Sequence, residues 1–267
     1  DPLFGNTPVD MDLGALLGKP PRMLRRASRV PVPRQPLRLA GVPLDEAIGR
    51  VLRAPAVADN TFLVTIGDRT VGGLCARDQC VGPWQVPVAD CAATLLDFDG
   101  YRGEAFAVGE RTPLAALDGP ASGRMAVAEA ITNLAAAPLV IDQVKLSANW
   151  MAAAGAPGED AVLFDTVRAV ALGLCPALGI SIPVGKDSMS MRTAWTAGGT
   201  RHEVMSPVSL IVSAFAPCAD VREVWTPSLR RDAGATVLAL IYLSGGRARL
   251  GGSTLAQVFG QVGDEVP

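Results

Sequence analysis

Two helix patterns, each followed by a short apolar strand pattern, constrain the fold of this chain more than any other feature. The first, GPASGRMAVAEAITNLAAA at 119–137, consists mostly of strong helix formers and ends before Pro138. The second, at 158–179, has acidic residues in its first turn and Pro176 near its end. We expect both segments to be α-helices.

The strand patterns are short segments rich in apolar and β-branched residues. They lie at 60–68, 70–78, 86–99, 143–150, 180–191, 206–218 and 235–243. Prolines break the pattern at 86–99, where a loop is expected around Asp90, and the pattern at 180–191 runs into a glycine-containing loop. Strands and helices thus mix in a β-β-α-β-α-β manner, which favours an α+β fold over a repeating parallel βα unit.

Shorter patterns lie on either side of this region. Residues 1–35 are rich in proline and glycine and predict a linker with a short helix at 13–18. An amphipathic helix is predicted at 43–55, and a glycine-rich turn leading into a helix is predicted at 244–260. The pattern restarts after Pro217, so we place a domain boundary near 217–226.

The composition argues against several classes of partner. Of the 267 residues, 49% are hydrophobic, which suffices for one large or two modest domains. The net charge is −2 and no polybasic block is present, so we expect no nucleic acid and no anionic membrane as partner. No uncharged apolar run reaches the roughly 18–20 residues that a membrane span needs. The first residues lack the features of a signal peptide, and the chain starts as though cut from a longer one.

The cysteines and the single histidine offer little for nucleophilic or zinc chemistry. The cysteines are Cys75, Cys80, Cys91, Cys175 and Cys218. Their odd number and scattered spacing argue against a disulfide framework and for a reducing cytoplasm. A zinc site or a catalytic cysteine would need a histidine nearby, but His202 lies far away, in a segment expected to be an exposed hairpin loop. We interpret the cysteines as small buried or half-buried thiols.

Two polar residues stand out in the apolar helix pattern at 119–137. Glu129 and Asn133 are four residues apart, so their side chains share one face of the helix. A carboxylate and a carboxamide are costly to bury unless they bind something, and Mg²⁺ prefers such oxygen ligands. Asp90 is a candidate third ligand. From spacing alone, a solvated outer face remains the alternative for the pair.

Two glycine-containing segments are weak candidates for phosphate binding. Neither common phosphate-loop motif, G-x-x-x-x-G-K-[ST] or G-x-G-x-x-G, is present. The segment PVGKDSMSM offers Lys186 and Asp187 after a strand pattern, and Gly251 and Gly252 precede a helix pattern, where backbone N–H groups can meet an anion. An ordinary tight turn is the alternative in both places.

Several long motifs, taken together, resemble one enzyme family. They are TFLVTIGDRTVGGLCARDQCVGPWQVPVADCA, GEAFAVGERTPLAAL, AVAEAITNLAAA, KLSANWMAAAGAPGEDA and LCPALGISIPVGKDSMSM. In this order they are similar to the large, single-chain form of phosphoribosylformylglycinamidine synthase, also called FGAR amidotransferase. The similarity covers nearly the whole chain, including LLGKPPRM and LGGSTLAQ.

The resemblance implies a reaction of purine biosynthesis. ATP activates the amide oxygen of formylglycinamide ribonucleotide as an iminophosphate, and ammonia released from glutamine attacks to give the amidine, ADP and phosphate. The synthetase region of this family has the fold of the aminoimidazole ribonucleotide synthetase superfamily, with two A and two B domains. Its glycine-rich catalytic ATP loop and its glutaminase residues belong to other parts of the enzyme, outside this sequence.

The resemblance also implies a domain division for this internal fragment. Residues 1–40 would be the end of a preceding domain and a linker, 41–217 the second A domain, and 218–267 the truncated start of the second B domain. The A domain would be a ferredoxin-like α+β sheet with helices on one face. It would pack against the first A domain of the same chain as a pseudo-dimer.

The family's metal and nucleotide site falls on residues of this sequence. Asp90, Glu129 and Asn133 match magnesium ligands, and Ala89 matches a position that contacts the nucleotide, ATP or ADP. A fourth family ligand lies in a stretch that this sequence does not contain. Lys186 and Asp187 lie in a family motif and are assigned a role near the active-site cleft.

Two other functions remain as alternatives. One is a different ATP-using enzyme of the same superfamily, such as a small-molecule kinase or selenophosphate synthetase; the lack of an N-terminal glycine-rich loop and the motif GPWQVPVADC count against it. The other is a nucleotide-binding scaffold module without activity.

Overall fold

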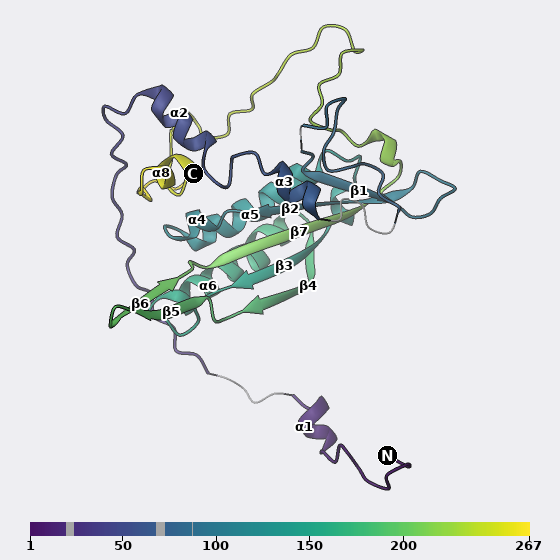
Figure 1. Cartoon of the computed structure of the whole chain (residues 1–267), viewed down its shortest axis with the longest axis vertical. Helices are drawn as coiled ribbons and strands as arrows, with labels where there is room; N and C mark the ends of the chain where they lie inside the picture. The colour runs from purple at the N-terminus through teal and green to yellow at the C-terminus, as the bar shows by residue number, and fades with distance from the viewer. Residues whose placement is uncertain (20–23, 68–72, 87) are drawn as a thin grey trace.

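A five-stranded mixed sheet with strand order β1-β2-β7-β3-β4 forms the centre of the protein (Figure 1). The computed structural model describes residues 1–19, 24–67, 73–86 and 88–267. The strands are β1 Cys91–Leu95, β2 Gly103–Glu110, β3 Lys145–Met151, β4 Ser181–Ser188 and β7 Ser209–Cys218. Neighbouring strands are antiparallel except β3 and β4, which are parallel. The expected α+β fold is confirmed.

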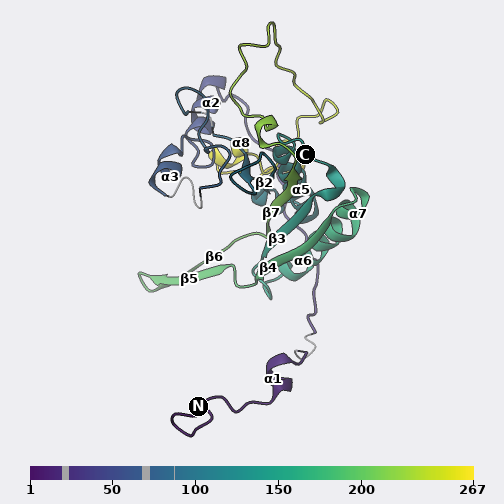
Figure 2. The same ribbon diagram turned by 90° about the vertical axis from the view of Figure 1, so that its right-hand side faces the viewer.

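Helices cover one face of this sheet, as Figures 1 and 2 show. They are α4 Thr112–Ala115, α5 Gly119–Leu134, α6 Glu159–Val167 and α7 Cys175–Ala177, with a π-helical segment at Arg168–Leu174 between the last two. The carboxylate of Asp118 accepts a hydrogen bond from the N–H of Ala121 at 2.8 Å and caps the start of α5. Both long helices predicted from the sequence are confirmed, although the second contains the π-helical segment.

The two faces of the sheet differ in their burial. Along β2 the buried side chains include Ala105 and Ala107, whereas Phe106 and Val108 between them remain 38% and 43% exposed. On the open face, the rings of Phe106 and Phe215 stack at a centroid distance of 5.8 Å. This alternation follows from the two-residue period of a strand with one covered face.

Helix α5 packs on β2 without intervening side chains at Gly109. A Cβ atom on Gly109 would lie 2.2 Å from the carbonyl oxygen of Ala126 and 2.4 Å from the nitrogen of Ala130. Both atoms belong to the helix backbone, which cannot move without shifting the whole element. Gly109 therefore fixes how closely α5 approaches the sheet, and so where its polar residues lie.

A two-stranded hairpin projects from the body (Figure 2). It consists of β5 Arg192–Ala197 and β6 Thr200–Met205, joined through Gly198 and Gly199 with positive φ angles of 57° and 75°. His202 lies in β6, where its ring stacks on Trp195 at 5.4 Å. The predicted exposed hairpin is confirmed, with His202 in a strand and not in the loop.

Segments from the two ends of the sequence lie together. Helix α2 Leu44–Leu52 contacts α8 Thr254–Val258, and α1 Leu13–Leu17 lies away from the body (Figure 1). The backbone N–H of Arg38 donates to Gln261 Oε1 at 2.8 Å, and Gln261 Nε2 donates back to the Arg38 carbonyl at 3.2 Å. The three short helices predicted from the sequence are confirmed.

Two predicted strands are wrong. Residues 61–66 form helix α3 Thr61–Ile66, whose start is stabilised because the carboxylate of Asp59 accepts a hydrogen bond from the N–H of Thr61 at 2.8 Å. Residues 235–243 are extended but unpaired and exposed, with Val237 at 91%. A strand needs a neighbouring edge, and this segment meets none among the residues described here.

The strand predicted at 70–78 lies partly outside the described residues, which omit 70–72. Its remainder forms a single bridge between Cys75 and Thr94. Short 3₁₀ helices occur at Ile141–Gln143 and Val221–Glu223. No helix in the described ranges is long and apolar enough to cross a membrane.

The cysteines are free thiols, of which Cys75 is half-buried and the other four are buried. Burial raises the pKa of Cys91 to about 11, so this thiol is neutral at physiological pH. The interpretation as packing thiols is confirmed.

Replacing Gly109 should destabilise the fold. We expect Gly109→Ala to lower the free energy of unfolding by about 1–3 kcal/mol or more, because the new methyl group would collide with helix backbone. Chemical denaturation followed by circular dichroism measures this. Gly67→Ala is the control, since a Cβ there meets nothing within 4 Å. Equal stability of the two variants would contradict the close packing of α5 on β2.

Thiol accessibility provides a second test of the fold. In the native chain Ellman's reagent should label Cys75 first, while the four buried thiols react only as the protein unfolds. In denaturant all five should react. Rapid labelling of more than one thiol under native conditions would show that the core is not packed as described.

Candidate functional site

The polar pair of α5 reaches the C-terminal end of β2. Glu129 Oε2 accepts a hydrogen bond from the N–H of Glu110 at 2.8 Å. One turn further along α5, Asn133 Nδ2 donates to the carbonyl of Val108 at 3.1 Å. The shared face that the i, i+4 spacing predicts is therefore directed at this end of the strand and engaged with its backbone.

Asp90 arrives at the same place from the neighbouring strand. Cys91, the first residue of β1, pairs with Ala107 of β2. Asp90 immediately precedes this pair on the chain, and Val108 immediately follows it on β2. The side chain of Asp90 is exposed. Asp90 is thus next to the last β1–β2 pair, and Glu129 and Asn133 bond to the β2 residues that follow this pair.

Ala89 is placed beside Asp90 by the loop that precedes β1. Its N–H donates to the carbonyl of Gln79 at 2.8 Å, and next to it Val88 bridges to Cys80. This pairing of two short segments fixes the backbone immediately before Asp90.

The guanidinium of Arg111 forms an ion pair with the carboxylate of Glu129. Arg111 Nη2 lies 3.0 Å from Glu129 Oε1, and the two side chains are 48% and 27% exposed. Both carboxylate oxygens of Glu129 therefore have partners: Oε1 has Arg111 and Oε2 has the N–H of Glu110. A partly exposed pair of this kind is weak enough to be exchanged for another partner.

The donor atoms suit a hard cation such as Mg²⁺. Two carboxylates and one amide oxygen are ligands that Mg²⁺ accepts, usually together with water and phosphate oxygens. Asn133 uses its nitrogen in the bond to Val108, so its oxygen is the atom that a cation would take. Within the described ranges no group of three His, Cys, Asp or Glu side chains could hold a metal. Any metal here would therefore need Asn133, or ligands from outside these ranges.

Lys186 and Asp187 lie at the same end of the sheet but not at this site. In the strand register, Glu110 pairs with Ile211, Ile211 with Asn149 and Asn149 with Lys186. Three strand spacings separate β2 from β4, or about 14 Å. Lys186 Nζ donates to Ser188 Oγ at 3.1 Å. Lys186 and Asp187 therefore lie at the same end of the sheet as Glu129 and Asn133 but separated from them by two strands.

Neither glycine segment is an open anion-binding loop. Gly185 to Ser188 belong to β4, and a Cβ on Gly185 would lie 2.3 Å from the carbonyl oxygen of Ala148, so Gly185 allows close approach to β3. The N–H groups of Gly251 and Gly252 already donate to the carbonyls of Glu265 and Val262, each at 2.8 Å. The hypothesis of a phosphate loop at either segment is therefore wrong for this structure.

The residue pattern does not predict two features near the ends of the sheet. Arg111 is one, because its contact with Glu129 crosses a strand-to-helix junction. The other is a cavity of about 1010 Å³ just beyond the C-terminal end of α5, bordered by Arg77, Arg222, Trp225 and Arg230. It contains none of the predicted site residues, and Arg222 and Arg230 are already paired with Asp220 and Asp232.

Comparisons with known proteins identify the central part of the chain. Residues 59–217 match the FGAR-AT PurM_N-like domain. Among solved structures, PurLQS from Thermotoga maritima is 16% identical over 75% of this chain, with a TM-score of 0.43. Phosphoribosylformylglycinamidine synthase II from Thermotoga maritima is 17% identical over 52%, with a TM-score of 0.39. Thermotoga maritima PurL complexed with AMPPCP is 16% identical over 77%, with a TM-score of 0.43.

This chain spans only about a quarter of the length of those solved structures, namely 27%, 21% and 29% of them. The domain match, in contrast, covers more than half of this chain and runs from before β1 to Pro217 near the end of β7, including Asp90, Glu129 and Asn133. The α+β sheet with its helical face is accordingly the aminoimidazole ribonucleotide synthetase-like fold. The chain belongs to the FGAR amidotransferase family, through its PurM N-like domain.

Proposed function

We propose that this chain is part of an ATP- and glutamine-dependent ligase that converts formylglycinamide ribonucleotide to formylglycinamidine ribonucleotide in purine biosynthesis. It supplies a Mg²⁺–nucleotide site and a partner surface for another synthetase domain. The observation that supports this best is that Glu129 and Asn133 bond to the end of β2, next to the strand pair that Asp90 precedes, in a member of this family.

The site would hold the metal through oxygen atoms from three elements. Asp90 offers an exposed carboxylate, Glu129 a carboxylate at the sheet edge and Asn133 an amide oxygen. Mg²⁺ bound here would neutralise the phosphates of ATP or ADP. Ala89, next to Asp90, has the backbone position from which a nucleotide could be contacted. In this proposal the glycine-rich catalytic ATP loop belongs to another domain of the whole enzyme.

The open face of the sheet supports a role as a partner for another domain. Phe106 and Val108 expose apolar surface, and Phe215 stacks on Phe106 beside them. Half-exposed aromatic and β-branched side chains on a sheet face are typical of a surface that another sheet covers. The proposed occupant is the first A domain of the same enzyme, with residues 41–217 as its second A domain.

The terminal segments support the proposed domain division. Residues 235–243 are apolar, extended and unpaired, as expected for the first strand of a B domain whose other strands follow later in the chain. Residues 1–40 would be the end of the preceding domain and a linker. The contacts of Arg38 with Gln261 then join this linker to the segment from 218 to 267.

Glutamine hydrolysis is assigned to a separate glutaminase domain. Its chemistry needs an activated nucleophile with a neighbouring base. Here burial raises the pKa of Cys91, Cys175 and Cys218, and His202 stacks on Trp195 in the projecting hairpin. A cytoplasmic location is proposed for the whole enzyme, because free thiols are maintained there.

Removing either carboxylate should weaken nucleotide retention in the full-length enzyme. We expect Asp90→Ala and Glu129→Ala to lower the amount of Mg²⁺-dependent bound nucleotide by about tenfold or more, because a metal ligand is lost. Glutaminase activity should remain. Nucleotide content after purification, with and without EDTA, is the measurement.

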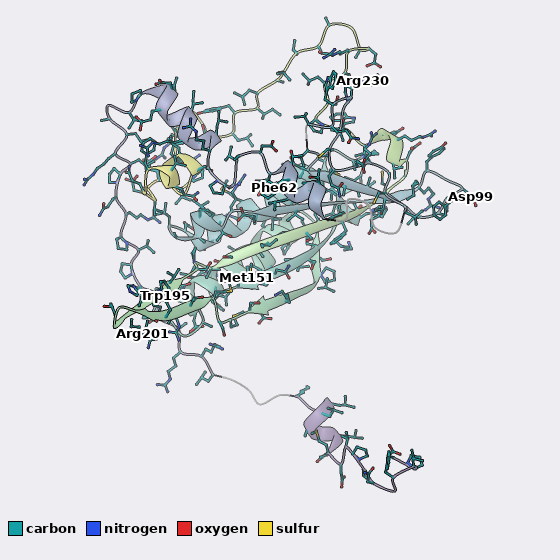
Figure 3. The ribbon with its side chains drawn as sticks, in the orientation of Figure 1. Phe62, Asp99, Met151, Trp195, Arg201 and Arg230 are labelled. Carbon is teal, nitrogen blue, oxygen red and sulfur yellow. The ribbon has the colours of Figure 1, made fainter. Side chains whose placement is uncertain are left out.

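The matched control for that experiment is Asp99→Ala. Asp99 is an exposed aspartate in the turn between β1 and β2, at the opposite end of the sheet (Figure 3). Its variant should retain nucleotide like the wild type. Unchanged nucleotide content in both ligand variants would refute the metal site.

Charging the open face should weaken domain pairing. We expect Phe106→Lys to reduce association of this chain with the first A domain by about tenfold or more, because it removes an aromatic anchor and buries a charge. Sedimentation velocity of the mixed domains measures it. Phe164→Lys on α6, an exposed phenylalanine on the helical side of the sheet, is the control. If both variants associate equally, another surface forms the interface.

A further inference from the structure

Arg111 already occupies the carboxylate that the proposed metal would need. We propose that Arg111 is the internal counter-cation of this site: it holds Glu129 when no metal is bound and is displaced when a divalent cation binds. The inference rests on the proposed metal site and deepens it, because it states what regulates the metal affinity of that site.

The geometry of Glu129 leaves one oxygen to be exchanged. Oε2 is held by the N–H of Glu110 at 2.8 Å, a backbone donor fixed at the end of β2. Oε1 faces Arg111 Nη2 at 3.0 Å. A metal that takes Oε1 leaves the backbone bond intact, so the carboxylate need not rotate away from the sheet. The guanidinium and the metal therefore compete for the same oxygen atom.

Arg111 is held at its backbone and free at its tip. Its carbonyl accepts a hydrogen bond from Ser122 Oγ at 2.6 Å and one from the N–H of Leu114 at 3.1 Å. Ser122 is only 2% exposed, which anchors the residue at the junction of β2 and α4. The Arg111 side chain, in contrast, is 48% exposed. The guanidinium can therefore swing into solvent while the backbone stays in place.

The charges oppose simultaneous binding of the metal and the guanidinium. Without metal, the Arg111 guanidinium balances Glu129, while Glu110 contributes another carboxylate at the end of β2 and Asp90 one just before β1. With a divalent cation on Glu129, a guanidinium at the same oxygen would be repelled. Metal binding therefore weakens the Arg111–Glu129 pair, and the stability of this pair subtracts from the metal affinity.

The test is Mn²⁺ binding to this chain without nucleotide. Mn²⁺ accepts the same oxygen ligands as Mg²⁺, and the electron paramagnetic resonance signal of the free ion gives the bound fraction directly. Competition with Mg²⁺ shows that both ions use one site. We expect Arg111→Gln to bind Mn²⁺ about fivefold more tightly than the wild type, because the competing pair is gone.

Three further variants complete the set, with a fourth in reserve. Arg111→Lys keeps the charge and should stay within about twofold of the wild type. Glu129→Gln should lose most of the binding. Arg201→Gln removes one arginine of an Arg–Glu pair in the distant hairpin (Figure 3) and should leave binding unchanged. If Arg111→Gln disturbs folding, Arg111→Met repeats the test with the apolar stem retained.

Thermal unfolding adds a readout that a merely structural salt bridge would not give. In EDTA the Arg111→Gln variant should unfold at a lower temperature than the wild type. Excess Mn²⁺ should raise its unfolding temperature by more than it raises that of the wild type, because the variant binds the ion more tightly.

The outcomes separate the two proposals. Tighter Mn²⁺ binding by Arg111→Gln, with loss in Glu129→Gln, supports the counter-cation. Equal or weaker binding by Arg111→Gln, with loss in Glu129→Gln, overturns the counter-cation and leaves the metal site standing. Binding by the wild type that Glu129→Gln retains, or no binding by any variant, overturns the metal site and the inference together.

Discussion

The direct contact of α5 with β2 at Gly109 is the constraint on which the rest of the structure depends. No side chain separates the two backbones here, and even a Cβ on Gly109 would lie only 2.2 Å from the carbonyl oxygen of Ala126. The buried residues around this contact are small, with Ala105 and Ala107 on the strand and Ala126 and Ala130 on the helix. This closeness brings the side chains of Glu129 and Asn133 within hydrogen-bonding reach of the β2 backbone. Larger side chains at this contact would move α5 away from β2, and Glu129 and Asn133 could then not reach the backbone of the strand.

The sequence predicted the elements whose signals are local. Both long helices have strong formers and clear ends, and the prediction of α5 is right to within three residues at its C-terminus. Strand β2 was not predicted, because its GEAFAVGE pattern alternates alanines with larger residues and carries a weak apolar signal. The segment at 60–68 was predicted as a strand from its β-branched content, but residues 61–66 form a helix, with the N–H of Thr61 bonded to the carboxylate of Asp59. Contacts with other parts of the chain decide which structure these two segments adopt, and residue propensity alone does not predict it.

The candidate site was partly predictable for the same reason. The i, i+4 spacing of Glu129 and Asn133 identifies a shared helix face, and the structure places that face against β2. The position of Asp90 depends on the register of β1 with β2, which a residue pattern does not specify. The sequence does not indicate the pair of Arg111 and Glu129, because the two residues are 18 positions apart and the starts of α4 and α5 lie between them. Lys186 was predicted in a loop but lies in the regular part of β4, three strands from the cluster.

The glycines of α5 also determine its packing on a second helix. On its other side α5 packs against side chains of α6: a Cβ on Gly119 would lie 2.5 Å from Thr166 Oγ1, and one on Gly123 would lie 2.7 Å from Thr166 Cγ2. Larger residues at these two positions would collide with α6, so Gly119 and Gly123 set how closely the two helices pack. Asp165 of α6 in turn accepts two hydrogen bonds of 2.8 Å from Arg29. The close packing of α5 therefore positions both Glu129 at the end of β2 and the α6 carboxylate that holds the N-terminal segment at Arg29.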